Sequence, residues 1–377
     1  MTNCLYIHIP FCVKKCIYCD FLSVPYDNAL AMNYVSSITK ELELRKHTAR
    51  TLKSVYIGGG TPTTVPTPDL IRILRKIKDS FDIAPDAEIT IEANPGTTGK
   101  ETFTALYESG INRISLGAQS FNEDELKLLG RIHDSSDALR SIVGARHAGI
   151  TNISIDLIYG IPGQTLDAWS HTVSEAIEIS PEHISAYELT IEDGTPLHKL
   201  IAKGEMEKPD EEIIVDMYYH AIDRFAKAGY GQYEISNFAR PGFECRHNLN
   251  YWNRGQYIGV GAAAHSFIEN ERTRNTDDIE KYIRATQGGK LAVEENNVIS
   301  PADAAKELIF LGLRKTEGLK IAECRNILGI DIAKTSKDLI AEGLLVSDSG
   351  RLRLTKKGIV VSTSVIAELL EGMEVTA

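Results

Sequence analysis

The chain has 377 residues, of which 43% are hydrophobic and 25% charged, the balance of a folded protein with a substantial core. Its formal net charge of −11 argues against broad attraction to nucleic acid or to an anionic membrane surface. No apolar run approaches the roughly 18 residues of a membrane span, and the first residues lack the basic-then-apolar pattern of a signal peptide.

Short β-rich runs alternate with segments of helical periodicity over the first half of the chain. The predicted strands are Leu5–Ile9, Ser54–Ile57, Glu88–Glu92, Arg113–Leu116, Asn152–Leu157 and His183–Glu188. The predicted helices are Ala29–Lys46, Thr67–Ser80, Thr98–Ser109, Asp124–Leu129, Ser135–Ala148 and Thr165–Ile179. This alternation predicts an α/β fold with a parallel sheet covered by helices. Six such units favour a partial (β/α)6 barrel, and a doubly wound open sheet is the alternative.

The pattern loosens after residue 190. A helix is predicted at Pro209–Ala228, then a glycine- and aromatic-rich loop from Tyr230 to Ser266, then a helix at Asp277–Thr286. We therefore expect three regions: a barrel over residues 1–230, a loop-rich and helical connecting region over 231–300, and a small C-terminal domain over 301–377.

The C-terminal domain has a winged-helix-like pattern. Helices are predicted at Ala302–Arg314, Ile321–Leu328 and Ala333–Glu342, followed by a hairpin of Leu344–Ser347 with Arg351–Thr355 and a last helix at Lys357–Leu370. Such a pattern suggests a DNA-binding regulator. Residues 300–377, however, carry eleven Lys or Arg and eleven Asp or Glu, so the domain is neutral and we expect no nucleic-acid partner.

The strongest chemical signal is a Cys-x3-Cys-x2-Cys run, Cys12-Val-Lys-Lys-Cys16-Ile-Tyr-Cys19, directly after the first predicted strand. A structural zinc site needs four ligands, and four-iron clusters normally take four cysteines. Three thiolates would leave one iron open. A zinc site completed by Cys4 or a distant histidine, or three structural thiols, are the alternatives. Thiols crowded in this way favour a reducing, cytoplasmic location.

Polar residues follow the later strands at the end where barrel sites form. They are Gly58-Gly59-Gly60-Thr61, Glu92, Gln119 and Asp156, and each taken alone also fits a turn, a cap or an ion pair. We expect them on the same rim as the cysteine loop. Arg131 is a candidate for clamping a carboxylate, or a solvated surface charge.

The cysteine run resembles the signature of the radical S-adenosylmethionine (SAM) superfamily. The resemblance implies a [4Fe-4S] cluster on Cys12, Cys16 and Cys19, with SAM on the open iron. In that superfamily an electron from the cluster cleaves SAM to a 5′-deoxyadenosyl radical, and the fold is a partial (β/α)6 barrel. The fold agrees with the six units predicted here.

Four motifs resemble a narrower branch, which holds the oxygen-independent coproporphyrinogen III oxidases and the HemW-type heme chaperones. They are Tyr6-Ile-His-Ile-Pro-Phe-Cys12, Gly58-Gly-Gly-Thr-Pro-Thr63, Ile114-Ser-Leu-Gly-Ala-Gln-Ser-Phe121 and Asp156-Leu-Ile-Tyr-Gly-Ile-Pro162. The resemblance implies SAM contacts from Tyr6, Gly59 and Glu92, with Tyr18 near the adenine. It also relates a second set to positions that hold a second SAM in the oxidases: Gly60, Thr61, Gln119, Arg131 and Asp156.

Two departures favour the chaperones over the oxidases. Cys19 is followed by Asp20-Phe21, whereas the oxidase motif continues Cys-x-Cys, and the first strand begins at Leu5 without the oxidases' N-terminal extension. The motif His247-Asn-Leu-Asn-Tyr-Trp252 also resembles the chaperones. It implies a heme ligand in His247 with aromatic walls beside it. From the residues alone, a structural loop is the alternative, and Cys245 is a rival ligand.

The sequence therefore predicts a heme chaperone of radical SAM type that binds heme and transfers it to an acceptor protein. Oxidative decarboxylation of coproporphyrinogen III is the alternative function, so the chain's status as an enzyme stays open. The further partners expected are an electron donor if SAM is cleaved, and a second copy of the chain in a homodimer.

Overall fold

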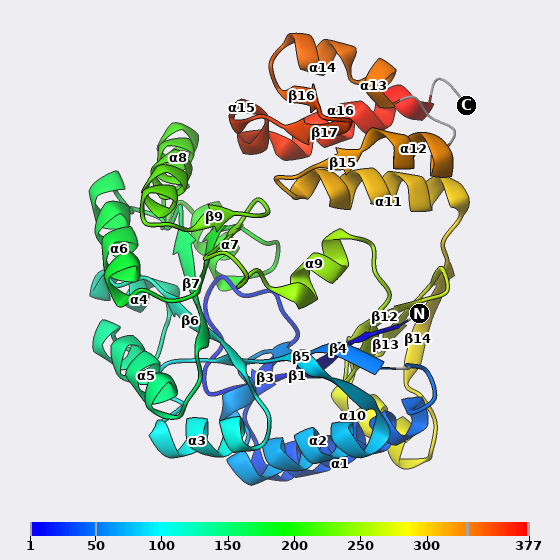
Figure 1. The fold of residues 1–377 in the computed structure, drawn as a ribbon. Helices are drawn as coiled ribbons and strands as arrows, with labels where there is room; N and C mark the ends of the chain where they lie inside the picture. Colours follow the sequence, from blue (N-terminus) through cyan, green and yellow to red (C-terminus); the bar gives the residue numbers. More distant parts are fainter. Residues whose placement is uncertain (1, 50, 329–331, 375–377) are drawn as a thin grey trace.

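The protein is described here by a computed structural model that covers residues 2–49, 51–328 and 332–374. Its centre is a nine-stranded sheet in which six parallel strands follow one another in chain order (Figure 1). These are β1 (Cys4–Ile9), β4 (Thr51–Gly59), β5 (Asp82–Ala93), β6 (Arg113–Gln119), β7 (Asn152–Tyr159) and β8 (His183–Glu188). A doubly wound sheet would reverse its strand order, so the sequential order confirms the partial barrel.

Helices cover the outer face of this sheet (Figure 1). They are α1 (Asn28–Arg45), α2 (Thr67–Ser80), α3 (Lys100–Glu108), α4 (Glu123–Leu129), α5 (Ser135–His147), α6 (Leu166–Ile179) and α8 (Glu211–Lys227). Helix α7 (Pro196–Ala202) instead lies beside the loop that follows β1, where Leu197 N donates to Ile17 O at 2.9 Å. Helix α2 shows why they pack this way, since Leu70, Ile73, Leu74 and Ile77 are buried at the i, i+3, i+4, i+7 spacing of one apolar stripe. No described helix is both long and apolar enough to cross a membrane.

Residues 231–300 join the barrel through both edges of the sheet. Strands β10 (Asn237–Ala239) and β9 (Gly231–Gln232) continue it beyond β8, and β11 (Ile258–Val260) pairs in parallel with β1. The prediction of a loop over residues 230–266 is therefore wrong, because short strands and the helix α9 (Arg246–Trp252) form there. Their polar and glycine-rich sequences carry no clear period, and long-range pairing determines their structure.

A second sheet lies beside the barrel and was not predicted. It consists of β12 (His265–Ile268), β13 (Glu271–Asn275) and β14 (Val293–Val298), all antiparallel, with α10 (Ile279–Gln287) between the last two strands. Helix α10 agrees with the predicted helix. The buried carboxylate of Glu41 on α1 joins this region to the barrel, since it accepts hydrogen bonds from Gly261 N, Asn275 Nδ2 and the Tyr282 hydroxyl.

The C-terminal domain combines helices with a three-stranded sheet. Its elements are α11 (Pro301–Arg314), β15 (Leu319–Lys320), α12 (Ile321–Leu328), α13 (Ile332–Thr335), α14 (Lys337–Ala341), β16 (Leu345–Asp348), β17 (Arg351–Leu354), α15 (Lys356–Val360) and α16 (Ser362–Glu374). The hairpin is confirmed. Two helices predicted as continuous are each broken, near Ser336 and near Val361. In Figure 1 the domain lies above the barrel, and Lys356 ties it to α8 through Asp223 at 2.6 Å.

Candidate functional site

A loop between β1 and α1 carries the three clustered cysteines. The short strands β2 (Phe11–Cys12) and β3 (Val24–Pro25) pair at its base, and Ile17 N donates to Leu129 O at 3.2 Å on its far side. The loop is therefore anchored at both ends. Cys12, Cys16 and Cys19 all line one cavity of about 960 Å³, here called the barrel-mouth cavity, at the carboxyl ends of the parallel strands. This is the rim at which the sequence predicts them.

The zinc alternative is not supported by the position of Cys4. Cys4 begins β1, whereas Cys12 follows the other end of that strand, so Cys4 is separated from the loop by the length of the strand. Within residues 2–49, 51–328 and 332–374, no three His, Cys, Asp or Glu side chains converge on a position for a single metal ion. Cys4 and Cys324 are buried, as expected for structural thiols.

Glycines at the end of β4 let the backbone approach the cysteine loop. Gly59 has a φ of +123°, a left-handed value that favours glycine. A Cβ atom on Gly60 would lie 2.8 Å from Phe11 O and 2.9 Å from Cys12 Sγ. The 3-10 turn η1 (Pro62–Thr64) follows, and the hydroxyl of Thr61 lies 3.6 Å from Cys12 Sγ. A side chain at Gly60 would thus displace the first cysteine.

Glu92 lies near the end of β5, beside this glycine run. Its carboxylate accepts hydrogen bonds from the Tyr56 hydroxyl at 2.9 Å and from Gly59 N at 3.1 Å. Burial, only partly opposed by the bond from Tyr56, raises the pKa of Glu92 to about 7. A cationic group in the cavity would favour the ionised form. The side chain is therefore suited to receive an ammonium group.

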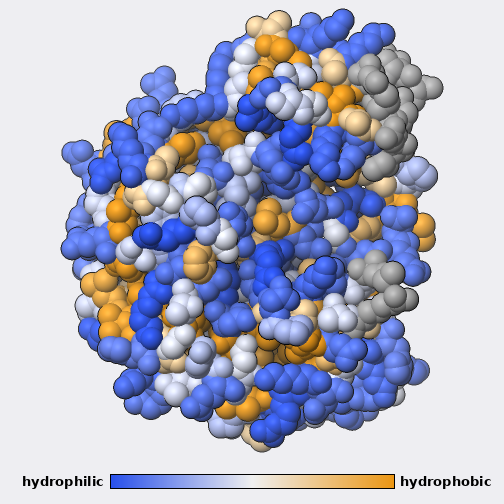
Figure 2. Space-filling model, viewed as in Figure 1, coloured by the Kyte–Doolittle hydropathy of each residue, from blue (hydrophilic) through white to orange (hydrophobic). Residues whose placement is uncertain are grey.

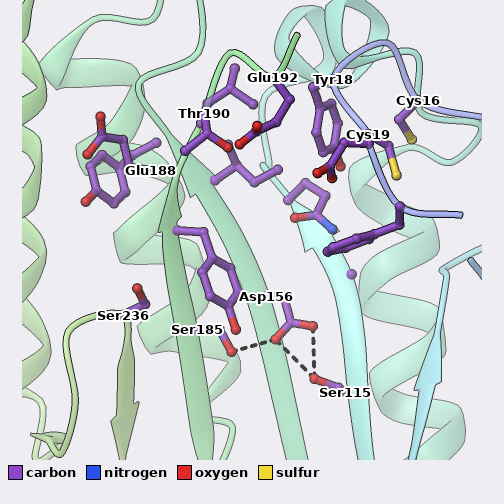
Figure 3. A pocket seen from close by; sticks show the side chains of 18 of the residues that line it. Cys16, Tyr18, Cys19, Ser115, Asp156, Ser185, Glu188, Thr190, Glu192 and Ser236 are labelled. Carbon is purple, nitrogen blue, oxygen red and sulfur yellow. Dashed lines mark hydrogen bonds between the residues drawn. The ribbon is translucent and has the colours of Figure 1, made fainter. Parts of the chain in front are cut away.

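Asp156 lies deeper in the same cavity, at the fifth position of β7. Its carboxylate accepts hydrogen bonds from Ser185 at 2.7 Å, Ser115 at 2.9 Å and Ser154 at 3.2 Å. Figure 3 shows the first two of these bonds, with Cys16 and Cys19 well above them in that view. Burial raises the pKa of Asp156. The alternation of inward-facing residues along β6 and β7 would have identified Ser115 and Ser154, which sequence analysis missed.

Arg131, Gln119 and Tyr18 complete the wall between Asp156 and the cysteines. Arg131 donates to Asn94 Oδ1 at 2.6 Å, to Gly117 O at 2.7 Å and to Cys16 Sγ at 3.4 Å, so it is not a solvated surface charge. Gln119 has a φ of +68°, a strained value for a residue other than glycine. Tyr18 is half-buried near Arg131, and burial raises its pKa. All three side chains line the cavity.

The C-terminal domain closes one side of the barrel-mouth cavity. Residues 359–363, at the junction of α15 and α16, line it together with Arg314 of α11. No site residue was predicted in this domain. The contact joins positions far apart in the chain, and no local pattern in the sequence indicates it.

Two predicted site residues lie outside this cavity. Tyr6 lies beside Tyr56 on the same side of the sheet, and its hydroxyl lies 3.0 Å from His8 Nδ1. His247 belongs to helix α9 rather than to a loop, and only 1% of its surface is exposed. Its Nδ1 lies 2.8 Å from the Ser54 hydroxyl and its Nε2 lies 3.0 Å from the Tyr251 hydroxyl. Both ring nitrogens of His247 are therefore engaged inside the protein.

The donor set of the barrel-mouth cavity fits a cluster with SAM. Three thiols come from one anchored loop, the backbone at Gly60 makes room beside Cys12, and the buried carboxylate of Glu92 has an acidity tuned by burial. Thiolates are the usual ligands of iron–sulfur clusters. Of the predicted cluster and SAM residues, the structure brings all but Tyr6 together here.

Comparisons with known proteins identify the superfamily and agree with the fold. Residues 6–176 match the radical SAM superfamily, and residues 299–361 match the HemN C-terminal domain. The coproporphyrinogen III oxidase HemN from Escherichia coli has the same fold, with a TM-score of 0.86 at 23% identity over 98% of this chain and 90% of that one.

Curated relatives resemble the chain more strongly in sequence. A protein named heme chaperone HemW from Lactococcus lactis is 36% identical, over 98% of this chain and 97% of its own length. The Bacillus subtilis protein of that name is 35% identical, over 97% and 98%, and the one from Escherichia coli is 36% identical, over 94% of each. The chain therefore belongs to the radical SAM superfamily and, within it, to the HemW family.

Proposed function

We propose that this protein is a cytoplasmic chaperone that binds heme and transfers it to an acceptor protein. The observation that carries the proposal is identity of 35–36% over nearly the whole chain to proteins named heme chaperone HemW. The proposal includes a [4Fe-4S] cluster on Cys12, Cys16 and Cys19, with SAM on the open iron.

The proposed roles are those that the family resemblance implies, and the position of these residues in the barrel-mouth cavity supports them. Glu92 would accept the ammonium group of SAM, and Gly59 and Gly60 would present backbone groups to its amino-acid end. Tyr18 would lie near the adenine. When bound, the cluster and SAM would supply a one-electron source and a cleavable sulfonium. Gly60, Thr61, Gln119, Arg131 and Asp156 would hold a second SAM, if one binds.

Porphyrinogen decarboxylation is the second candidate, favoured by the size of the barrel-mouth cavity and by its position over the cysteine loop. It would require cleavage of SAM, and hence an electron donor. Asp20 and Phe21 after Cys19 favour the chaperone. His247 stays a prediction for the heme ligand, and a homodimer stays a further expectation.

The test is an anaerobic titration of heme into the reconstituted protein, followed by mixing with an apo form of a b-type heme protein. We expect saturation near one heme per chain, and activation of the acceptor that depends on the loaded chaperone. No saturable binding would refute the chaperone. Release of 5′-deoxyadenosine together with a vinyl product from coproporphyrinogen III would establish the enzyme instead.

A further inference from the structure

A second cavity, of about 670 Å³, includes Tyr6 and His8 of β1 in its lining and is here called the aromatic cavity. It is bounded by α9, by the β12–β13 hairpin and by α11, three elements labelled in Figure 1. Phe21 and Leu22, which follow the last cysteine, line one wall. Its volume is within the range of pockets that bind cofactors and drug-sized ligands.

The walls of this cavity are mostly aromatic. Tyr251, Trp252, Tyr257, Phe267 and Phe310 line it. Tyr251 and Tyr257 meet edge to face with ring centroids 4.7 Å apart, and Phe310 is 40% exposed at the mouth. Flat apolar walls of this kind suit a large planar ligand, whereas the barrel-mouth cavity is lined by carboxylates, hydroxyls and thiols.

His265 lies on the rim with a free imidazole. It is the first residue of β12, it is exposed, and its ring forms no hydrogen bond to another residue in the described part of the chain. His8, the other histidine of the cavity, differs in this respect. Its Nδ1 lies 3.0 Å from the Tyr6 hydroxyl and its Nε2 lies 3.0 Å from Leu22 O. His265 is thus the histidine of this cavity that is available as an iron ligand.

Two arginines also line this cavity and share one carboxylate. The guanidinium groups of Arg254 and Arg272 lie 4.7 Å and 5.2 Å from the centroid of the Phe267 ring. Both pair with Glu307, at 2.8 Å and 2.5 Å. Two cations against one anion leave a local positive charge.

Two buried donors here have no acceptor among the described residues, Nη2 of Arg254 and the indole nitrogen of Trp252. A buried donor without an acceptor is unfavourable. A ligand carboxylate that reached the arginine pair would give Nη2 of Arg254 an acceptor.

The last two residues of the His247-Asn-Leu-Asn-Tyr-Trp252 motif face this cavity. Tyr251 and Trp252 line the cavity, while His247 lies behind them, 3.0 Å from the Tyr251 hydroxyl. His247 therefore supports a wall of the cavity without entering it.

We propose that heme binds in the aromatic cavity, with His265 as an iron ligand and the Arg254–Arg272 pair holding its propionates. This proposal rests on the proposed heme binding and gives it a place away from the barrel mouth.

The test repeats the heme titration with four variants. The position of the Soret band and the affinity for heme are measured for each. His265→Ala should shift the Soret band and weaken binding about tenfold, because it removes an iron ligand. Phe310→Glu, on an exposed position of α11, should weaken binding several-fold by placing a carboxylate at the mouth. His171→Ala, an exposed histidine on α6, is the matched control. His247→Ala tests the rival ligand.

The outcomes separate the location from the function. Wild-type spectra in both His265→Ala and Phe310→Glu, with saturable heme binding intact, would overturn the aromatic cavity and leave the chaperone standing. A Soret shift in His247→Ala alone would likewise overturn it. If the wild-type protein bound no heme in a saturable way, the proposed function itself would fail.

Discussion

The barrel-mouth cavity and the aromatic cavity are built in different ways. The first collects charged and polar side chains from the ends of consecutive parallel strands, so its groups recur at regular intervals in the sequence. The second is assembled from β1, α9, a polar hairpin and the C-terminal α11. A rim site can therefore be recognised strand by strand, whereas a cavity between elements exists only once distant segments have packed.

The two cavities are nevertheless adjacent. Phe21 lines both of them. Tyr6 stacks beside Tyr56 with ring centroids 6.3 Å apart, and the Tyr56 hydroxyl donates to Glu92. A continuous set of contacts thus runs from the wall of the aromatic cavity to the carboxylate of the barrel mouth.

The surface seen in Figure 2 is mostly hydrophilic, with hydrophobic residues in small scattered groups.

Removing the cysteines should produce the largest difference between the cavities. In a Cys12→Ala, Cys16→Ala, Cys19→Ala variant we expect complete loss of cluster iron and of its visible absorbance, because no thiolate remains in the loop. Heme binding should persist. Cys324→Ala, which removes a buried thiol from α12, is the control and should keep its iron. Joint loss of iron and heme binding would show that the cavities are not separable.

His247→Ala should mainly affect stability. The substitution leaves the hydroxyls of Ser54 and Tyr251 without their buried partner and opens a cavity, so we expect a loss of about 2–3 kcal/mol in the free energy of unfolding. Urea denaturation measures this loss. A variant as stable as the wild type would contradict the structural role of His247.

The pH dependence of stability gives a second measure of His247. Burial lowers its pKa to about 3, so the folded protein binds this proton less readily than the unfolded chain does. The stabilisation is complete above the ordinary pKa near 6.5 and is lost as the pH falls from there toward 3. Buried His183 acts in the same direction. The His247→Gln variant should therefore show a shallower loss of stability with acid.

The residues of the barrel mouth could be placed on one rim from the sequence because strand ends can be located from local patterns. Gly59, Glu92 and Gln119 each follow or end a β-rich run, and parallel strands bring such ends to one edge. The register between neighbouring strands could not be predicted from such local patterns. Asp156 lies inside β7 and not at its end. The serines around it come from neighbouring strands, so their contact with Asp156 is recognised only when the strands are aligned.

The aromatic cavity could not be predicted in this way. Strand β13 reads Glu-Arg-Thr-Arg-Asn and every residue of β14 is exposed, so neither shows an alternating apolar pattern. The burial of His247 depends on Glu88 of β5, whose carboxylate accepts from its backbone N–H at 3.0 Å across 159 positions of sequence. A motif alone does not reveal which of its side chains faces a ligand.

Glu92 should make SAM binding at the barrel mouth depend on pH. Its pKa of about 7 lies above the ordinary value of 4.5, so the neutral form is stabilised in the free protein, while an ammonium group requires the charged form. SAM affinity should therefore rise up to about tenfold between pH 6 and pH 8, and equilibrium dialysis measures it. Glu92→Gln should abolish this rise. Glu192→Gln, at the rim of the same cavity, is the control. A pH rise that survives in Glu92→Gln would assign it to another group.

Phe21→Ala should give the smallest effect and the sharpest test of how the cavities are joined. The side chain is 64% exposed, so its removal should change the free energy of unfolding by less than about 0.5 kcal/mol. It covers part of the aromatic cavity, and we expect about threefold weaker heme binding from the lost apolar contact, which a titration resolves. SAM affinity should stay unchanged, because the ring offers no polar group to the barrel mouth. If the variant instead weakened SAM binding and left heme binding unchanged, Phe21 would belong to the barrel mouth, and the wall between the cavities would begin at Leu22.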